Sequence, residues 1–381
     1  MISKNVIPEG TRDLVFNECR RKKSIISSLE NTFDKWGYDE VITPTIEYYS
    51  TFFRGEEGIN EEEVYKFFDG NGRILSLRPD MTVPICRVIS TKMKEVEPPI
   101  RLRYTSNVFR VNRTFGGKKN EYVDCGVELV GAKELEGDIE ILTAALQAFE
   151  NLNIKDFKIE IGNIKFFNSL FEQTKIDESE REKLAVLIEG KSLIELEDFL
   201  NGLNIQESSK NFLKKLPWLF GDETILDKEI EMTTDNRIKD TLLYLKRINE
   251  ILNKLGYENN ITFDLGMVPG VNYYTGIIFK GYVNGARAAV LSGGRYDNLI
   301  KSFGRDLPAV GFSINVDLIW ENECLNEDAK IQECTIYYGK NNLVQAISES
   351  NKLRSSGSRV KIFLKENDDD FFYVYSGGDL E

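Results

Sequence analysis

The feature that most constrains this chain is the order in which its strand-like segments follow one another. Alternating apolar and polar residues predict strands at 100–111 and 121–131, separated only by the loop TFGGKKNE. A second pair, VYKFFDGNGRILSLRP, has Asp-Gly-Asn-Gly at its turn, which is typical of a hairpin. Strands joined by short loops pair antiparallel, whereas parallel strands need a longer crossover. The sequence therefore predicts an α+β fold with a largely antiparallel sheet.

The domain organisation is indicated by length and by a change in composition. A chain of 381 residues is too long for one ordinary compact core. Residues 164–255 are rich in Glu and Lys and show helical spacing, as in LAVLIEGKSLIELEDFL. We interpret them as a helical insertion that divides a core of residues 1–163 and 256–322. Residues 323–381 are predicted to form a small β-α-β-β unit.

The remaining elements of the core are predicted from periodicity and from turn signals. Helices are expected at 20–36, 80–95 and 137–151. Further strands are expected at 157–163, 261–268, 273–283 and 286–291. The segments GGRYDNLIKSF and GFSINVDLIWEN are each predicted to begin a helix.

The chain contains no histidine. This excludes Ser-His and Cys-His nucleophilic catalysis, imidazole metal ligands and imidazole proton transfer. The five cysteines show no CxxC pair, which argues against a disulfide framework and against a thiolate zinc site. We therefore expect no metal, and reduced thiols with structural roles. The cysteines are Cys19, Cys86, Cys125, Cys324 and Cys334.

The charge and hydropathy of the chain limit which classes of partner and which cellular locations we expect. A net charge of −13 disfavours a nucleic-acid partner, which would need a basic face, although 101–119 is a local basic stretch. No apolar run approaches the ~20 residues of a membrane helix. The amino-terminal MISKNVIPEG lacks an apolar signal core. We expect a cytoplasmic protein with no membrane and no nucleic-acid partner.

The strand EYVDCGVELVG carries two carboxylates on one face. Period-two spacing places Asp124 and Glu128 on the same face, on either side of Gly126. A cationic ligand could lie on the bare backbone between these acids. A solvated polar face explains the same pattern equally well.

Three other polar motifs are weak when taken singly. In SLRPDMTVP, Arg78 ends a strand and Asp80 suits the N-cap of the next helix. Arg110 in NVFRVNR could bind a carboxylate or a phosphate, or could pair with a carboxylate on the next strand. SGGRYD is predicted to be a tight glycine turn that brings Arg295 and Tyr296 to a sheet edge.

No cofactor motif is complete. GNGRIL lacks the third glycine of a dinucleotide fingerprint, and FGGKKN lacks the GK[ST] core of a P-loop. FDLGMVPGVNYYTGIIFKGY (263–282) resembles a strand floor for a small ligand, with tyrosines for packing, yet no acid, base or cation lies between Asp264 and Lys280. We expect no cofactor.

Eight motifs occur along the chain in a fixed order: PEGTRDL, GYDEVITPTIE, LSLRPDMTVP, VFRVNR, DCGVELVG, NYYTGIIF, SGGRYDNLI and AVGFSINVD. Together, over about residues 6–322, they resemble the catalytic core of class II histidyl-tRNA synthetases. The resemblance implies a class II synthetase-like antiparallel sheet flanked by helices, a helical insertion and a small C-terminal α/β unit. It also implies a homodimer formed partly through the first motif.

The sequence departs from this family where synthetases handle ATP. The positions of the catalytic arginine and of the motif 3 arginine fall on Pro269 and Leu318. The glutamate and the second arginine of motif 2 fall on Asn112 and Asn120, so that Arg110 alone remains among these groups. Adenylate formation needs preorganised cations around the reacting phosphorus. We therefore expect no catalytic residue and no amino-acid activation.

The amino-acid pocket of the family is partly retained. Seven positions match residues that contact histidine in synthetases, with aspartate in place of glutamate at one and of glutamine at another. Carboxylates there suit an ammonium or imidazolium group, and tyrosines suit an aromatic ring. The matching residues are Asp80, Thr82, Arg110, Asp124, Glu128, Tyr274 and Tyr296.

This combination resembles one group of histidyl-tRNA synthetase paralogues, the regulatory subunits of ATP phosphoribosyltransferase. The resemblance implies a hetero-oligomer with the short-form catalytic subunit, with histidine as the feedback effector. The absence of histidine suits a chain needed when histidine is scarce, although drift in an AT-rich genome gives the same composition. The alternatives are a divergent histidyl-type synthetase and a synthetase-like paralogue that binds another amino acid.

Overall fold

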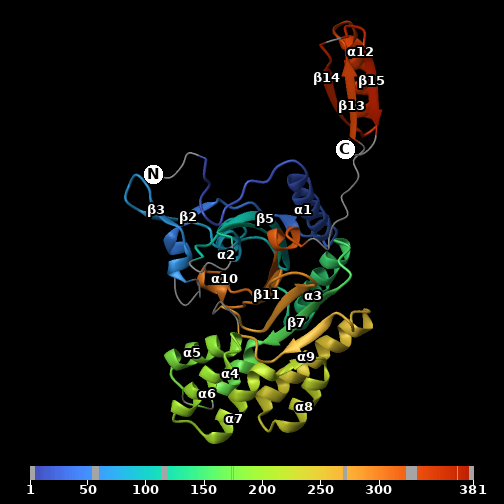
Figure 1. The fold of residues 1–381 in the computed structure, drawn as a ribbon. Helices are drawn as coiled ribbons and strands as arrows, with labels where there is room; N and C mark the ends of the chain where they lie inside the picture. Colours follow the sequence, from blue (N-terminus) through green and yellow to red (C-terminus); the bar gives the residue numbers. More distant parts are fainter. Residues whose placement is uncertain are drawn as a thin grey trace. The chain divides into compact units, whose positions relative to one another are not determined.

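The computed structural model describes residues 5–53, 60–112, 119–172, 174, 176–268, 273–322, 333–366 and 368–376. The chain separates into two compact units, residues 1–325 and 326–381. Each unit has a sheet of its own (Figure 1).

The first unit is built on a nine-stranded sheet. Neighbouring strands are antiparallel except in two pairs, β1 with β5 and β7 with β9. This confirms the predicted α+β fold with a largely antiparallel sheet. In spatial order the strands are β1 (Asp39–Glu40), β5 (Ile100–Phe109), β6 (Glu121–Val130), β12 (Ala309–Asn315), β11 (Leu291–Arg295), β10 (Ile277–Val283), β7 (Phe157–Asn163), β9 (Ile261–Asp264) and β8 (Phe220–Gly221).

The two faces of this sheet carry different cores. Helices α1 (Asn17–Lys35) and α3 (Glu134–Asn151) pack together over the face on which Val123, Cys125 and Val127 are buried. Helices α2 (Thr82–Thr91) and α10 (Leu299–Ser302) pack together over the other face, where the core includes Tyr104 and Tyr296. The period-two alternation of β6 therefore directs its odd-numbered residues to one core and its even-numbered residues to the other.

A three-stranded sheet contains the hairpin predicted from its Asp-Gly-Asn-Gly turn. Its strands are β2 (Ile46–Tyr48), β4 (Ile74–Leu77) and β3 (Lys66–Phe68), in that spatial order and antiparallel. The side chain of Asp69 accepts hydrogen bonds from the backbone N–H groups of Asn71 and Arg73 at 2.9 Å each. An aspartate that closes its own turn in this way explains the sharp reversal.

Two predictions for the last part of the core are wrong. Residues 309–315 form the strand β12 instead of a helix, and only the short α11 (Val316–Trp320) follows it. The β12 residues Phe312, Ser313, Ile314 and Asn315 alternate between apolar and polar, which is the pattern of a strand, so the helix prediction overlooked a signal in the sequence. The strand predicted at 286–291 instead begins at Leu291 and continues through the glycines of SGGR as β11.

The predicted glycine turn at SGGRYD is therefore a strand in the interior of the sheet. A Cβ atom on Gly293 would lie 2.5 Å from the Gly311 carbonyl oxygen and 2.6 Å from the ring of Phe279. Glycine is required there because neighbouring groups approach the backbone closely. The prediction of a turn mistook a packing requirement for a turn signal.

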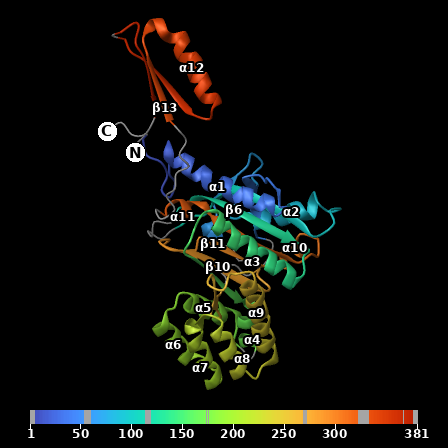
Figure 2. The same ribbon diagram turned by 90° about the vertical axis from the view of Figure 1, so that its right-hand side faces the viewer.

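Helices fill the segment between β7 and β9, in agreement with its predicted helical character. They group together (Figure 2), and α9 packs against α3, α4, α8 and β7. The short β8 within this segment pairs with β9 and was not predicted. The helices are α4 (Ile164–Glu172), α5 (Glu178–Glu189), α6 (Leu193–Gly202), α7 (Glu207–Lys215), α8 (Thr224–Met232) and α9 (Asn236–Lys254). Their assignment to a separate domain stays a prediction.

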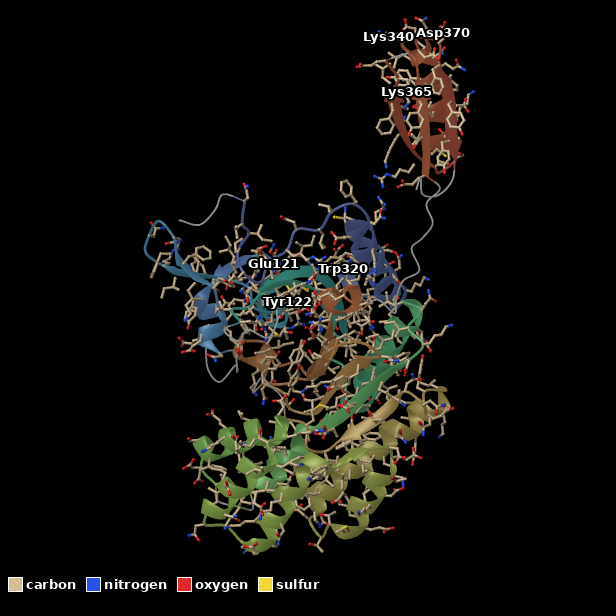
Figure 3. The ribbon with its side chains drawn as sticks, viewed as in Figure 1. Glu121, Tyr122, Trp320, Lys340, Lys365 and Asp370 are labelled. Atoms are coloured by element: carbon tan, nitrogen blue, oxygen red, sulfur yellow. The ribbon has the colours of Figure 1, made fainter. Side chains whose placement is uncertain are left out.

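The second unit has the predicted β-α-β-β order. Its elements are β13 (Glu333–Tyr338), α12 (Leu343–Ser355), β14 (Arg359–Leu364) and β15 (Phe372–Ser376). β13 lies in the middle, parallel to β14 and antiparallel to β15. Figure 3 labels Lys365 here, whose ammonium lies 4.9 Å from the ring centroid of Tyr337. Among the described residues, no helix is long and apolar enough to cross a membrane.

Candidate functional site

The seven predicted pocket residues line one cavity of about 300 Å³ in the first unit. They reach it from α2 and the residues before it, from the end of β5, from β6, and from the segments before β10 and after β11. The residues that the structure brings together are Asp80, Thr82, Arg110, Asp124, Glu128, Tyr274 and Tyr296.

Glu128 forms the buried end of the cavity. Its carboxylate accepts a hydrogen bond from Thr82 Oγ1 at 2.9 Å and another from the hydroxyl of Tyr296. Burial raises the pKa of Glu128 to about 8, against the lowering effect of these two hydrogen bonds, and the nearby Asp80 adds to the rise. The carboxylate is therefore held in place, and no cation in the described part of the chain forms an ion pair with it. A bound ligand with a cationic group would supply the positive charge that Glu128 can pair with.

Gly311 makes room for this carboxylate. It lies opposite Glu128 in the β6–β12 register, and a Cβ atom on it would lie 1.8 Å from Glu128 Oε2. In the same way, a Cβ on Gly294 would lie 2.6 Å from Cε1 of Tyr274. These glycines of β12 and β11 seat the side chains of the cavity.

Gly126 has a different role from the one predicted. It lies opposite Tyr104 on β5, and a Cβ atom on Gly126 would lie 2.6 Å from the Tyr104 hydroxyl oxygen. The space above this glycine therefore belongs to Tyr104, and the predicted bare floor between two acids is wrong. Tyr104 itself lines the cavity.

Asp124, Asp80 and Arg110 form a second group of charges. Burial raises the pKa of Asp124 to about 7, while Arg110 lowers it and Asp80 raises it. Burial lowers the pKa of Arg110, but nearby Tyr122, Asp80 and Asp124 reverse the shift and raise it overall. Arg110 Nε donates to the Pro79 carbonyl oxygen at 3.0 Å. The charge of Arg110 thus interacts with the charges of Asp80 and Asp124. Its binding of a ligand carboxylate or phosphate and its pairing with the next strand both stay predictions.

Asp80 has the capping role that the sequence indicated. Its Oδ1 accepts from the backbone N–H of Val83, in the first turn of α2, at 3.1 Å. This bond fixes the start of α2 and thereby the position of Thr82 beside Glu128. Capping and cavity lining are therefore compatible for Asp80.

Aromatic rings cover one side of the cavity. Tyr273 lies edge-on to Tyr274, with ring centroids 5.0 Å apart, and edge-on to Tyr296 at 5.9 Å. Burial, and then the charge of Glu128, raise the pKa of Tyr274. These phenols stay neutral and present both ring surface and a hydroxyl group. This arrangement suits an aromatic or apolar ligand group with a polar edge.

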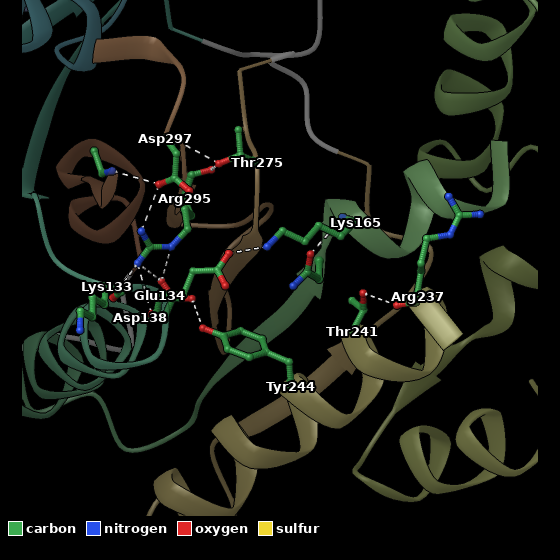
Figure 4. A network of polar contacts seen from close by, with 12 residues as sticks. Lys133, Glu134, Asp138, Lys165, Arg237, Thr241, Tyr244, Thr275, Arg295 and Asp297 are labelled. Atoms are coloured by element: carbon green, nitrogen blue, oxygen red, sulfur yellow. Dashed lines mark hydrogen bonds and ion pairs between the residues drawn. The ribbon is translucent and has the colours of Figure 1, made fainter. Parts of the chain in front are cut away.

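Arg295 does not line the cavity. It is completely buried, and its Nη2 lies 2.6 Å from Asp138 Oδ1 of α3 (Figure 4). Asp138 also accepts from the hydroxyl of Tyr244 on α9 at 2.6 Å. Burial raises the pKa of Asp138 to about 6, against the lowering effect of Arg295 and Tyr244. Arg295 therefore joins β11 to α3 and indirectly to α9, which replaces the predicted position at a sheet edge.

Some cavity residues were missed by the sequence analysis. Lys280 of β10 and Ser292 of β11 lie opposite each other, and Ser313 of β12 lies opposite Ser292. The alternation of IIFKGY could have indicated Lys280, because it shares a face with Ile278. Glu189 reaches the cavity from α5, and no local sequence pattern indicates that contact.

The positions that depart from the synthetase pattern carry neutral side chains. Leu318 packs at the margin of the core, and the Nδ2 of Asn112 donates to the Lys119 carbonyl oxygen at 2.8 Å. The Nδ2 of Asn120 donates to the Glu9 carbonyl oxygen at 3.1 Å. Pro269 lies outside the described residues. Among the described residues, the cations that line the cavity are Arg110 and Lys280.

A metal ion would need several ligating side chains close together in the described part of the chain. No group of three or more His, Cys, Asp or Glu side chains there has the arrangement of a metal site. Four of the five cysteines fall in the described part of the chain and are free, and Cys324 falls outside it.

Comparison with known proteins places this geometry in a family. Residues 10–319 match the family model of histidyl-tRNA synthetase. The chain is 38% identical over 369 residues to the ATP phosphoribosyltransferase regulatory subunit of Clostridium acetobutylicum, covering 96% of this chain and 91% of that protein. It is 40% identical over 361 residues to the same subunit of Clostridium kluyveri, covering 93% and 92%.

Similar solved structures come from the same family. A structure described as an ATP phosphoribosyltransferase regulatory subunit/histidyl-tRNA synthetase from Bacillus halodurans has a TM-score of 0.86 and 30% identity, covering 97% of this chain and 95% of that one. Histidyl-tRNA synthetase from Nostoc has a TM-score of 0.80 and 20% identity, covering 96% and 88%, and so shares the fold. The chain therefore belongs to the histidyl-tRNA synthetase family and, within it, to the ATP phosphoribosyltransferase regulatory subunits.

Proposed function

We propose that this chain is a non-catalytic subunit that supports and regulates the short-form ATP phosphoribosyltransferase in the first step of histidine biosynthesis. The observation that carries this proposal is a contrast between two sets of positions. Carboxylates and tyrosines suited to an amino acid line the cavity, while the neutral residues Pro269, Leu318 and Asn120 stand at positions at which synthetases carry arginines.

The missing cations weigh against amino-acid activation on energetic grounds. The charge that develops on phosphorus and its oxygens must be stabilised by preorganised positive groups. Losing one such group commonly costs roughly 3 kcal/mol of barrier, or about a hundredfold in rate. Pro269, Leu318 and Asn120 supply no positive charge. The cavity is therefore suited to binding and not to adenylate chemistry.

Histidine is the ligand that we propose for the cavity. The buried carboxylate of Glu128 would receive the imidazole or imidazolium, and the tyrosines would pack against its ring. Asp80 and Asp124 would receive the α-ammonium group. We expect micromolar to millimolar affinity, about −4 to −8 kcal/mol.

A homodimer is the assembly that we propose for the chain itself. Apolar side chains around the first motif are exposed in the single chain: Ile42 is 82% exposed, Ile46 48% and Tyr48 44%. Exposed apolar groups that are close together favour a protein interface. A second copy of the chain would cover them.

The decisive assay measures ATP phosphoribosyltransferase activity of a short catalytic subunit with and without this chain, and with added histidine. We expect activity only in the mixture, and inhibition by histidine. Histidine-dependent ATP–pyrophosphate exchange by the purified chain would instead establish a divergent synthetase. Failure to activate the catalytic subunit would favour an independent amino-acid-binding paralogue.

A further inference from the structure

Lys280 connects the cavity to the helical segment. It lies on β10 opposite Ser292, with its side chain on the cavity face of the sheet. Its Nζ forms an ion pair of 2.9 Å with Glu189, the last residue of α5. Among the described residues of 164–255, Glu189 is the one that lines the cavity. A single ion pair thus links the floor of the cavity to the helices.

A second cavity of about 270 Å³ lies on the other side of this ion pair. It shares Glu189, Lys280 and Met267 with the first cavity. Glu160 and Asp264 line it, and burial raises the pKa of both carboxyl groups, while Lys191 and then Lys280 lower both. Lys280 therefore pairs with Glu189 and lies near two other carboxylates, which it shares with Lys191.

The charges of the first cavity are divided between its two ends. Asp124 and Glu128 lie on β6, and Lys280 lies three strands away on β10. Arg110, the other cation, is already opposed by Asp80 and Asp124. Lys280 is opposed on the cavity side by Glu189, whose side chain is 41% exposed. An ion pair with a partner this exposed contributes little, so exchanging that partner costs little.

We propose that Lys280 binds the carboxylate of the amino-acid ligand and in doing so releases Glu189, so that occupancy of the cavity frees the end of α5. This inference rests on the proposed function, because it takes an amino acid as the ligand. The ligand's cationic groups occupy the end of the cavity formed by β6, and its anionic group faces β10. The position of α5 then reports whether the cavity is filled.

Ligand binding tests the first half of this proposal. Calorimetry compares L-histidine with histamine, which lacks the carboxylate, on the full-length chain in complex with its catalytic subunit. Lys280→Met should weaken histidine binding about 10- to 100-fold, the range for a hydrogen bond to a charged group, and should leave histamine binding unchanged. Lys214→Met is the matched control, because its 2.9 Å ion pair with Glu197 lies within the helical segment and does not line the cavity.

Hydrogen–deuterium exchange tests the second half. Histidine should speed amide exchange at the C-terminal end of α5 and the start of α6. Glu189→Gln should produce the same increase without any ligand, and histidine should then add nothing further. Glu197→Gln, which breaks the control ion pair, should leave the response to histidine as in the wild type.

The outcomes separate the proposal from the function on which it rests. Equal loss of histidine and histamine binding in Lys280→Met, or no loss of either, overturns the assignment of the carboxylate. If Glu189→Gln without ligand shows the same amide exchange at the end of α5 as the wild type, the proposed release of α5 is wrong, whatever the effect of histidine. If the wild-type complex is active but binds no histidine, the effector is wrong and this inference falls with it. If the chain binds histidine but activates no catalytic subunit, the proposed function fails while the role of Lys280 stands.

Discussion

At the scale of single residues, the cavity depends on a carboxylate that is buried without a cation. Glu128 is 1% exposed and receives hydrogen bonds from two hydroxyl groups. Hydroxyl donors stabilise its charge less than the water that burial removed, so its pKa is raised to about 8. The folded protein therefore binds a proton there that the unfolded chain releases.

This gives a prediction with a defined sign. Between about pH 4.5 and pH 8 the folded state holds more protons at Glu128 than the unfolded state, so this residue lowers stability as the pH rises. Glu128→Gln cannot ionise. Its free energy of unfolding should exceed that of the wild type at pH 8, by on the order of a few kcal/mol, and the difference should shrink toward pH 5. Urea unfolding at both pH values measures this, and a difference independent of pH would contradict it.

The same substitution, which should raise stability, should weaken the binding of histidine. Glu128→Gln keeps one of the two oxygens that accept from Thr82 and Tyr296, replaces the other with an NH2 donor, and removes the charge that an imidazolium would pair with. We expect histidine to bind about tenfold more weakly or worse. Calorimetry measures this, and unchanged affinity would show that the ring lies elsewhere in the cavity.

Arg295 gives a third prediction at this scale. Its buried ion pair with Asp138 leaves a charged carboxylate without a partner if the guanidinium is removed. Breaking a buried pair in this way costs about 3–5 kcal/mol, so Arg295→Met should lower the free energy of unfolding by that order. Lys301→Met, in a pair exposed on both sides, is the control and should change little. Equal effects of the two substitutions would contradict the structural role.

At the scale of elements, glycines on neighbouring strands shape the cavity. Gly311 on β12 faces Glu128 on β6, and Gly294 on β11 faces the ring of Tyr274. The sheet register places both glycines. A larger residue at either position would therefore displace a side chain that belongs to another segment. The sheet and the cavity are thus specified by the same residues.

Gly311→Ala tests this coupling. The added methyl group would meet the Glu128 carboxylate at 1.8 Å, so either the carboxylate or the strand must move. We expect lower stability, by about 1–3 kcal/mol, together with loss of histidine binding. Gly202→Ala, at a position with open space around it, is the control and should affect neither. Wild-type affinity in Gly311→Ala would contradict the account.

Elements differ in how far the sequence could predict them. β5 was predictable because it alternates between one core and half-buried polar residues, and β6 because it alternates between two unlike cores. The seven cavity residues were predictable because they lie in recognisable motifs. β12 also alternates, from Phe312 to Asn315, and the prediction of a helix there overlooked this pattern. The role of Gly126 and the pairing of Lys280 with Glu189 depend on contacts between distant segments, and no local pattern carries that information.

At the scale of the whole molecule, the chain is a regulatory subunit by family, and its surface must bind other subunits. Exposed apolar residues around the first motif are suited to a second copy of the chain. Ile42→Glu should shift the chain from dimer to monomer in light scattering without unfolding it, because Ile42 is 82% exposed in the single chain. A variant that stays dimeric would place the interface elsewhere.

The measurement that tests the central claim most directly is the activity of a short ATP phosphoribosyltransferase catalytic subunit titrated with this chain. The account predicts that activity rises to a plateau as the chain is added and that histidine then inhibits the mixture. It also predicts that the Glu128→Gln complex is active but less sensitive to histidine. No activation at any ratio, together with histidine-dependent ATP–pyrophosphate exchange by the chain alone, would contradict the account.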